Sequence, residues 1–270
     1  MYLLSTVKIG KFFWGGYLMK IEGQDVVITG GASGIGLACA QFLQASDARV
    51  WALDRDQQAL DAASDQFAGV SDPPQFVCCD VGDEAELAST IGRVDEESGG
   101  IDILISNAAV LRDQTLVSKL GGKIKQHSLA DWDETIRCNL TGTFLAAREV
   151  ATAMIRGKRS GLIINMSSIS RAGNPGQSAY AATKGGIDAL TVTWSQELAP
   201  YRIRVAAIAP GFVETPMTEN IPALFLEQIR EKTPLRRFGE LEEFAHAVKF
   251  VIENDYFNGK TLELDGGLRF

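Results

Sequence analysis

Histidine is scarce in this chain of 270 residues, which contains only His127 and His246. Two imidazoles are too few for a His-rich metal centre, so the sequence predicts no metal site. The cysteines form no C-x-x-C pair, and we expect free thiols or small apolar core residues in a reducing compartment, the cytoplasm. These cysteines are Cys39, Cys78, Cys79 and Cys138.

Long apolar runs and an excess of basic residues are also absent. No run of 18 uncharged apolar residues occurs, so no transmembrane helix is predicted. The chain carries 26 Lys and Arg against 34 Asp and Glu, a formal net charge of −8. That balance argues against nucleic-acid or membrane partners, because both favour a basic face. A content of 46% hydrophobic and 22% charged residues is typical of a soluble folded protein.

The first 18 residues differ from the rest of the chain. They are apolar and aromatic, but Lys8 and Lys11 interrupt them and no convincing cleavage site follows. We interpret residues 1–18 as a tail that is dispensable, packs on a partner subunit, or serves as a targeting or membrane-surface element. Met19 then begins a domain over residues 19–270, which no linker or internal repeat divides.

From residue 24 onward, short apolar runs alternate with amphipathic stretches. This order predicts right-handed crossovers and an α/β fold, a Rossmann-type doubly wound parallel sheet of about seven strands in a single domain. The expected strands are Val26–Thr29, Arg49–Leu53, Gln75–Cys79, Ile103–Ser106, Gly161–Met166, Arg204–Ile208 and Lys260–Leu264. The expected helices are Gly34–Ala45, Asp83–Ser98, Leu129–Ala153, Tyr180–Ala199 and Glu240–Ile252.

A glycine cluster occupies the first strand-to-helix turn, where Gly30, Gly34 and Gly36 lie within Thr-Gly-Gly-Ala-Ser-Gly-Ile-Gly. Glycines at such a turn let the backbone approach a pyrophosphate at a helix N-terminus, so the cluster predicts dinucleotide binding. Asp54 ends the second strand, where a carboxylate can hydrogen-bond the ribose hydroxyls of NAD and repel the 2′-phosphate of NADP. We expect NAD, although the neighbouring Arg55 could accommodate a phosphate and Asp54 could be merely solvated.

Tyr180 and Lys184 are four residues apart on a predicted helix and therefore share a face. A nearby cation favours phenolate, so Lys184 is expected to lower the tyrosine pKa from its usual value of about 10. Asp80 with Val81, and Asn107, follow the third and fourth strands, at the edge where ligands bind in open α/β sheets.

Together these residues resemble the short-chain dehydrogenase/reductase family over residues 21–270. The matching elements are Thr29–Gly36, Asp80 with Val81, Asn107 to Ala109, Asn139, Ser167 with Ser168, Tyr180 with Lys184, and Pro210 with Gly211. The resemblance implies that Tyr180 is the general acid/base and that Lys184 lowers its pKa while binding the nicotinamide ribose. It further implies that Asn139 holds a water linked to Lys184, and that a serine after the fifth strand binds the substrate oxygen. Cofactor contacts are implied for Ser33, Ile35, Asp80, Val81, Asn107, Val213 and Thr215.

The choice of catalytic serine depends on where the count starts. Most family members place it 13 residues before the tyrosine, which selects Ser167, whereas counting along the strand from Gly161 selects Ser168. Because strand register fixes side-chain direction and loops absorb deletions, we expect Ser168.

Three further segments resemble type-2 3-hydroxyacyl-CoA dehydrogenases, a group that includes hydroxysteroid dehydrogenases of type 10. They are Leu111–Ser128, Ala209–Met217 and Val251–Phe270. This resemblance implies an NAD-dependent enzyme of fatty acid metabolism that interconverts a secondary alcohol and a ketone, 3-hydroxyacyl-CoA and 3-oxoacyl-CoA. It also implies a homotetramer joined through Leu129–Ala153 and Tyr180–Ala199. The alternatives are a 3-oxoacyl-carrier-protein reductase, a steroid or polyol dehydrogenase, and a non-catalytic dinucleotide-binding sensor.

Residues around 216–238 are expected to form a lid over the substrate. Its apolar face suits acyl or steroid substrates, although an ordinary amphipathic helix packed on the sheet has the same pattern. That face comprises Ile221, Leu224, Phe225, Leu226 and Ile229. Lys232, Arg236 and Arg237 could meet CoA phosphates or simply be solvated.

Overall fold

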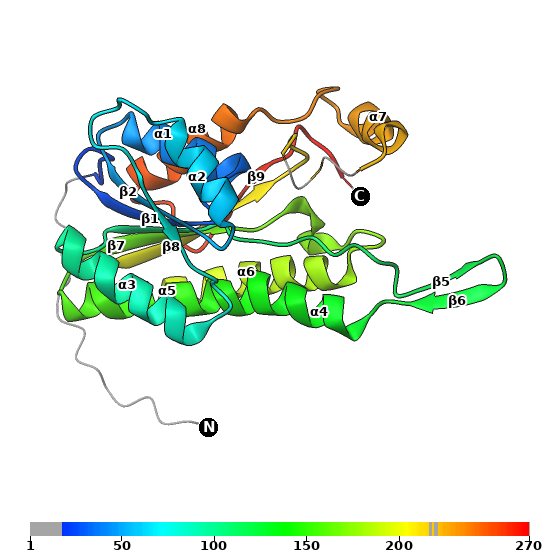
Figure 1. Cartoon of the computed structure of the whole chain (residues 1–270), viewed down its shortest axis with the longest axis horizontal. Coiled ribbons are helices and arrows are strands. Elements are labelled where there is room, and N and C mark those ends of the chain that lie inside the picture. The colour runs from blue at the N-terminus through cyan, green and yellow to red at the C-terminus, as the bar shows by residue number, and fades with distance from the viewer. Residues whose placement is uncertain (1–17, 216–217, 219–220, 270) are drawn as a thin grey trace.

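A seven-stranded parallel sheet forms the centre of the molecule, as the sequence predicts. The computed structural model describes residues 18–215, 218 and 221–269 (Figure 1), so all of the expected tail except Leu18 lies outside the described residues. The strand order is β3-β2-β1-β4-β7-β8-β9. The strands are β1 (Asp25–Thr29), β2 (Arg49–Asp54), β3 (Gln75–Cys78), β4 (Ile103–Ser106), β7 (Gly161–Met166), β8 (Ile203–Pro210) and β9 (Thr261–Leu264).

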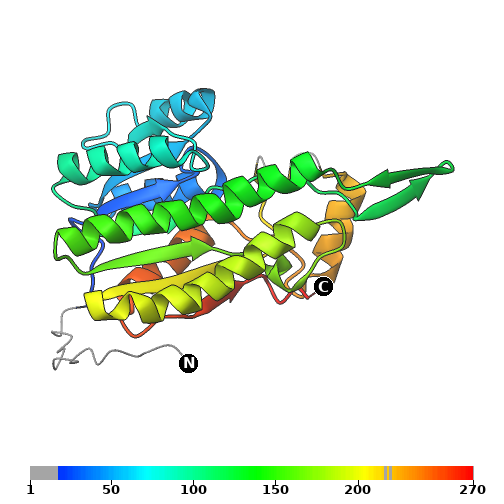
Figure 2. The ribbon, with the colours of Figure 1, turned by 90° about the horizontal axis from the view of Figure 1, so that it is seen from below.

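Helices cover both faces of this sheet, which explains why its central strands are almost wholly apolar. On one face lie α1 (Gly34–Gln44), α2 (Gln57–Asp65) and α8 (Leu241–Glu253) (Figure 1). On the other face lie α3 (Glu84–Ser98), α5 (Gly142–Arg156) and α6 (Ser178–Glu197) (Figure 2). Side chains of β1 alternate between the two cores, with Val26 and Ile28 packed in one and Val27 in the other.

The chain reverses its direction of travel across the sheet at β1. It builds outward through β2 and β3, then crosses back to place β4 against the other edge of β1. The connections that leave the carboxyl ends of β1 and β4 therefore run to opposite faces of the sheet, which makes this a topological switch point, the usual ligand position in such sheets.

The predicted long helix at 129–153 consists of three consecutive helical segments. α4 (Leu129–Thr135) leads into a π-helical turn, η1 (Ile136–Thr141), and then into α5. The Ser128 side chain caps α4 by accepting a hydrogen bond from the Asp131 amide at 3.1 Å. Figure 2 shows this long rod lying beside α6.

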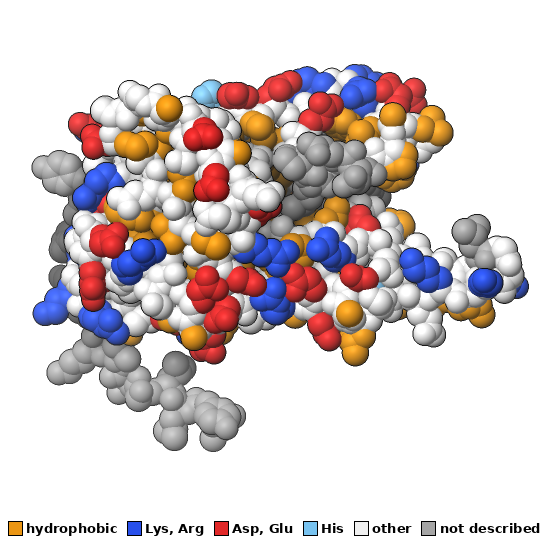
Figure 3. All heavy atoms as spheres, viewed as in Figure 1, with side chains coloured by type: hydrophobic (Ala, Val, Ile, Leu, Met, Phe, Trp, Pro, Cys, Tyr) orange, Lys and Arg blue, Asp and Glu red, His pale blue; other side chains and the backbone are white. Residues whose placement is uncertain are grey.

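Other elements were not predicted, notably α2 and a two-stranded hairpin of β5 (Val117–Leu120) and β6 (Lys123–Gln126). The hairpin projects from the body of the molecule (Figure 1) and turns at Gly121 and Gly122, which have φ of +56° and +80°. Positively charged side chains lie along it, whereas acidic and basic side chains are mixed around α7 (Ala223–Lys232) (Figure 3). Two short 3₁₀ turns, η2 (Ile169–Ala172) and η3 (Ala199–Tyr201), complete the described elements.

Within the described ranges, no helix combines the length and apolarity needed to cross a membrane. The same part of the chain contains no group of three His, Cys, Asp or Glu side chains that could hold a metal ion. All four cysteines are free, and Cys78 is exposed whereas the other three are buried.

Candidate active site

One large cavity, about 740 Å³, lies at the carboxyl ends of the sheet strands. Residues from the loops after β1, β2, β3, β4, β7 and β8 line it, together with α6. Of the predicted site residues, only Gly36 and Asn139 do not line this cavity. Those that do are Gly30, Ser33, Gly34, Ile35, Asp54, Asp80, Val81, Asn107, Ser168, Tyr180, Lys184, Val213 and Thr215.

Several glycines at the turn from β1 into α1, Gly30 and Gly36 among them, have no room for a side chain. Gly30 has φ of +63°, and a Cβ there would lie 2.7 Å from the Ala108 Cα. A Cβ on Gly36 would lie 2.0 Å from the Gly30 carbonyl oxygen. Gly36 therefore acts behind the cavity wall, where it lets the loop fold back onto α1, and Gly30 keeps the loop surface flat.

The start of α1 is open to the cavity. Ser33 is the N-cap residue, but its exposed side chain makes no capping hydrogen bond, and the first turn contains no acidic residue. The first N–H groups of a helix have no partner within the helix, so this end can bind an anion. A glycine surface beside an uncapped helix start fits the pyrophosphate of a dinucleotide.

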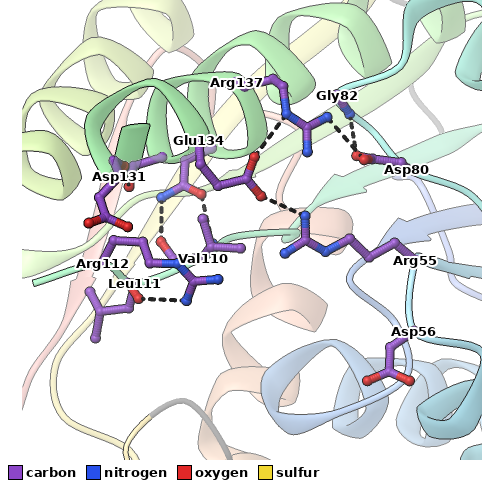
Figure 4. A network of polar contacts seen from close by, with 12 residues as sticks. Arg55, Asp56, Asp80, Gly82, Val110, Leu111, Arg112, Asp131, Glu134 and Arg137 are labelled. Carbon is purple, nitrogen blue, oxygen red and sulfur yellow. Dashed lines mark hydrogen bonds and ion pairs between the residues drawn. The ribbon is translucent and has the colours of Figure 1, made fainter. Parts of the chain in front are cut away.

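Asp54 lies at the cavity edge, and its carboxylate is held in place. One of its oxygens accepts a hydrogen bond from the Ala32 amide at 3.4 Å, and the other accepts one from the Asp56 amide at 3.2 Å. Arg55 pairs instead with Glu134 of α4, with 2.7 Å between Nη1 and Oε1 (Figure 4). The position expected to select the cofactor thus presents a carboxylate, and the neighbouring guanidinium is engaged elsewhere.

Asp80 and Asn107 brace the loops on either side of that edge. Asp80 accepts hydrogen bonds from the Gly82 amide at 2.8 Å and from Arg137 at 3.0 Å (Figure 4). Asn107 donates through its side-chain amide to the Gly30 carbonyl at 2.8 Å. Val81 is buried at 6% exposed and forms part of the apolar cavity wall.

The structure brings Tyr180, Lys184 and Ser168 together. The Lys184 Nζ lies 5.4 Å from the centroid of the Tyr180 ring and donates to the Met166 carbonyl at 2.6 Å. The Tyr180 and Ser168 hydroxyls are hydrogen-bonded to each other. Because Tyr180 and Lys184 are one turn apart on α6, the helix itself fixes their spacing.

Burial governs the protonation of both α6 residues. Burial raises the pKa of Tyr180 to about 12, and the hydrogen bond with Ser168 lowers it only in part. Burial also lowers the pKa of Lys184 to about 8. The expectation that the tyrosine pKa lies below its usual value is wrong for this structure, because desolvation of the phenolate outweighs the lowering effect of the Ser168 hydrogen bond.

The geometry favours Ser168 over Ser167 as the serine nearest the reaction centre. Ser168 reaches the tyrosine hydroxyl, and its Oγ accepts a hydrogen bond from the Ser170 amide at 3.1 Å. The Ser167 hydroxyl instead donates to the Lys184 backbone carbonyl at 3.3 Å. These directions agree with the count made along the strand.

Asn139 lies in the π-helical turn, and its side chain is wholly buried. Its Oδ1 accepts a hydrogen bond from the Val110 amide at 2.7 Å, and its Nδ2 donates to the Val110 carbonyl at 2.9 Å. The side chain therefore holds the loop that follows β4, which forms one wall of the cavity.

Sequence reasoning missed Asp113 and Gln177, which line the substrate end of the cavity. Gln177 donates to Asp113 at 2.9 Å and accepts from Ser170 at 2.8 Å and Asn174 at 2.9 Å. Burial raises the pKa of Asp113, against the lowering effect of this hydrogen bond. Gln177 precedes Tyr180 by one helical turn, and that spacing was the one signal available in the sequence.

The predicted lid residues divide between two roles. Ile221 and Phe225 line the cavity, whereas Leu226 and Ile229 pack with Phe238. Leu224 is 75% exposed. The segment thus serves partly as a cavity wall and partly as an ordinary packed helix, while residues 216–217 and 219–220 lie outside the described part.

A doubly wound sheet with a glycine-lined helix start and a Ser, Tyr and Lys cluster defines a dinucleotide-binding oxidoreductase. The chain belongs to the short-chain dehydrogenase/reductase family, whose members act on CH–OH groups. Residues 30–269 match the family model described as enoyl-(acyl carrier protein) reductase.

Proteins similar to this chain cover nearly its whole length. It is 39% identical over 253 residues to 3-oxoacyl-[acyl-carrier-protein] reductase FabG of Thermotoga maritima, covering 93% of this chain and 99% of that protein. It is 35% identical over 258 residues to 3-hydroxyacyl-CoA dehydrogenase type-2 of Rattus norvegicus, with coverage of 93% and 97%. A gluconate 5-dehydrogenase from Burkholderia cenocepacia, solved with NADP and tartrate, has a TM-score of 0.83 and 31% identity, with coverage of 92% and 96%.

Proposed function

We propose that this protein is an NAD(H)-dependent oxidoreductase that interconverts 3-hydroxyacyl and 3-oxoacyl thioesters, with coenzyme A as the carrier. The observation that carries the proposal is the hydrogen-bonded Ser168 and Tyr180 pair beside Lys184, inside a cavity that also contains a dinucleotide cradle. The apolar walls at Leu111, Ile169 and Phe225 suit an acyl chain.

The residues present fit a bound dinucleotide. The loop at Gly30 and Gly34 and the start of α1 would hold its pyrophosphate, Asp54 its adenine ribose, and Lys184 its nicotinamide ribose. When bound, the nicotinamide supplies or accepts a hydride. With a pKa of about 12, Tyr180 is a phenol at neutral pH and can donate its proton to the ketone oxygen.

The same groups serve the reverse reaction. Tyr180 must then take the alcohol proton, and the Ser168 hydroxyl and the Lys184 ammonium both stabilise the phenolate. Ser168 also orients the substrate oxygen and stabilises the charge that develops on it.

The cofactor proposal rests on Asp54. A fixed carboxylate at the end of β2 would hydrogen-bond ribose hydroxyls and repel a 2′-phosphate, which favours NAD over NADP. The similar gluconate 5-dehydrogenase was solved with NADP, so cofactor preference must be measured directly.

A second candidate is a 3-oxoacyl-carrier-protein reductase. The relative from Thermotoga maritima favours it, since that reductase works on the same 3-position oxygen with a protein carrier. Steroid and polyol substrates, and a non-catalytic sensor, are the remaining alternatives.

The exposed free thiol of Cys78 supports placement in the cytoplasm, where thiols stay reduced.

A substrate screen tests the proposal. Purified protein, NAD⁺ and 3-hydroxyacyl-CoA of several chain lengths should produce NADH, measured by its absorbance. Tyr180→Phe should abolish turnover while leaving NAD⁺ binding intact. Turnover confined to carrier-protein thioesters with NADPH would establish the second candidate, and NAD⁺ binding without turnover on any substrate would support the sensor.

A further inference from the structure

Four charged side chains form a continuous chain of contacts beside the cavity, whose lining includes two of them, Arg55 and Asp80 (Figure 4). Glu134 of α4 is at its centre, with Oε1 2.7 Å from Arg55 Nη1 and Oε2 2.9 Å from Arg137 Nε. Arg137 continues to Asp80, with 3.0 Å between Nη1 and Oδ2. Both oxygens of Glu134 are thus engaged, each with a different guanidinium.

The contact with Glu134 determines where Arg55 points. Arg55 directly follows Asp54 at the end of β2, yet Figure 4 shows its side chain extending toward Glu134 and away from Asp56. Glu134 lies 79 residues further along the chain. Hydrogen bonds from Arg137 and then Arg55 lower the pKa of the Glu134 carboxyl, so the carboxylate stays charged at neutral pH.

This arrangement changes the electrostatics beside Asp54. Arg55 and Arg137 are the two cations of the cluster, and Glu134 and Asp80 neutralise them. Asp54 and Asp56 contribute further negative charge, which no cation of the cluster balances. A phosphate placed beside Asp54 therefore meets net negative charge, while the nearest guanidinium is engaged by another carboxylate.

We propose that Glu134 is a positioning residue for cofactor selection: by holding Arg55 against α4, it keeps that guanidinium from the 2′-phosphate of NADP. The inference rests on the proposed use of NAD(H). Selection is then shared between Asp54, which repels the phosphate, and Glu134, which withholds the arginine that would bind it.

The test measures dissociation constants of NAD⁺ and NADP⁺ by titration calorimetry, independently of turnover. Glu134→Ala frees Arg55 and should tighten NADP⁺ binding by about tenfold, the effect of one new charge-assisted contact. NAD⁺ binding should change by less than about twofold, because its 2′-hydroxyl carries no charge. In the double variant E134A/R55A the gain for NADP⁺ should disappear.

Two controls separate this effect from general loss of charge or structure. Glu84→Ala removes a carboxylate that also pairs with an arginine, Arg148 at 2.7 Å, but Arg148 does not line the cavity as Arg55 does, so both dissociation constants should stay unchanged. Arg55→Ala alone should leave NADP⁺ binding within about twofold of the wild type, because Arg55 is already withheld.

Two results overturn the inference. One is an unchanged ratio of the two dissociation constants in E134A, and the other is NADP⁺ binding weakened by Arg55→Ala alone. A wild type that binds NADP⁺ more tightly than NAD⁺ would contradict the proposed use of NAD(H). The inference about Glu134 would still be tested separately, because it depends on how E134A changes each dissociation constant relative to the wild type.

Discussion

Burial shifts the protonation of Tyr180 and Lys184 in opposite directions, and both shifts favour the uncharged form. In the proposed reaction, the tyrosine at neutral pH is a proton donor for ketone reduction, whereas alcohol oxidation requires the less populated phenolate. The hydrogen bond from Ser168 and the nearby ammonium make that phenolate accessible. The direction of the reaction is thereby linked to pH at a single residue.

Alcohol oxidation should become faster as pH rises from about 6 to 8, where Lys184 still carries its proton, because the phenolate fraction of a group with a pKa of about 12 grows about tenfold per pH unit. Ketone reduction should not accelerate over the same range, because the phenol already predominates. Initial rates in both directions at saturating cofactor check this. Equal pH profiles in the two directions would contradict it.

Replacement of each serine should distinguish their roles. Ser168→Ala removes the hydroxyl bonded to Tyr180 and should lower kcat by about 10²-fold, typical of losing one donor at a developing oxyanion. Ser167→Ala removes a hydroxyl that contacts only backbone in α6 and should retain most activity. Near-full activity in S168A would reverse the assignment.

The pKa of Lys184 predicts a stability change with pH. Between about pH 8 and 10.5 the unfolded chain retains a lysine proton that the folded protein has lost, so stability rises with pH. The wild type should gain up to about 1.4 kcal/mol per pH unit relative to Lys184→Met, which has no such group. Urea unfolding at about pH 7.5 and 9.5 measures the gap. A gap that does not change with pH would mean that the lysine pKa is not lowered.

The sequence predicted where the proposed catalytic side chains meet, because parallel strands place their carboxyl ends at one edge. It did not predict Asp113, whose partner Gln177 lies 64 residues away in the chain. The sequence also could not predict that the pKa of Tyr180 is raised, because desolvation of the hydroxyl depends on how other residues pack around the ring. Motif spacing reveals residues on one element, and ion pairs between distant elements require the folded chain.

At the scale of single elements, the π-helical turn η1 interrupts the regular helix between α4 and α5. Its extra residue per turn is a local change of helix pitch, and such turns occur often at functional sites. Here it carries Asn139, whose amide pairs with both backbone groups of Val110. The turn thus connects the α4 and α5 rod to the cavity wall. One turn of altered pitch leaves the 3.6-residue pattern almost intact, so the sequence predicted an unbroken helix.

Asn139→Ala should lower the free energy of unfolding by about 2–4 kcal/mol, because it leaves the backbone N–H and C=O of Val110 without these partners. Asn174→Ala, which removes an amide from a half-buried loop, should cost less than about 1 kcal/mol. Urea unfolding of both variants tests the difference. Equal losses would mean that the Val110 contacts add no particular stability.

The β5–β6 hairpin should be dispensable for folding. Its strands pair with each other, and the chain is already closed at its base by the His127 amide and Leu116 carbonyl, 3.0 Å apart. Replacing residues 117–126 by two glycines should change the free energy of unfolding by less than about 1 kcal/mol. Thermal and urea unfolding check this. A larger loss would show that the hairpin packs on another part of the protein. The hairpin is exposed and combines apolar with basic and polar residues, so its sequence lacks the pattern of a buried strand and did not predict it.

On the scale of the whole molecule, the sequence predicted all seven sheet strands. β1, β2, β4, β7 and β8 are largely buried apolar runs, whereas the edge strands β3 and β9 are only partly buried. Helical boundaries were predicted within a few residues where amphipathic faces are long. The parallel, doubly wound arrangement followed from the alternation of strands and helices, whereas the order of the strands comes from the structure. The long α5 and α6 helices present apolar side chains to solvent, including Phe144 at 42% and Val192 at 48% exposed.

We expect these faces to join four chains. Light scattering coupled to size exclusion should give four times the 29.2 kDa of one chain. Phe144→Glu with Val192→Glu should reduce the measured mass, because burial of charge without a partner is costly. A monomeric wild type would contradict the proposed homotetramer without affecting the proposed chemistry.

The position of β1 in the sheet has a consequence for synthesis of the chain. The ribosome releases β1, β2 and β3 first, and these can assemble on one side of β1 as they emerge. The opposite edge of β1 stays open until Ile103 arrives to pair with Val26. An unpaired apolar edge invites pairing with other chains. When β4 joins the sheet, the open apolar edge passes to β4, which pairs with β7 only after Leu162 has followed. A nascent chain that lacks β7 is therefore a form that needs protection by a chaperone.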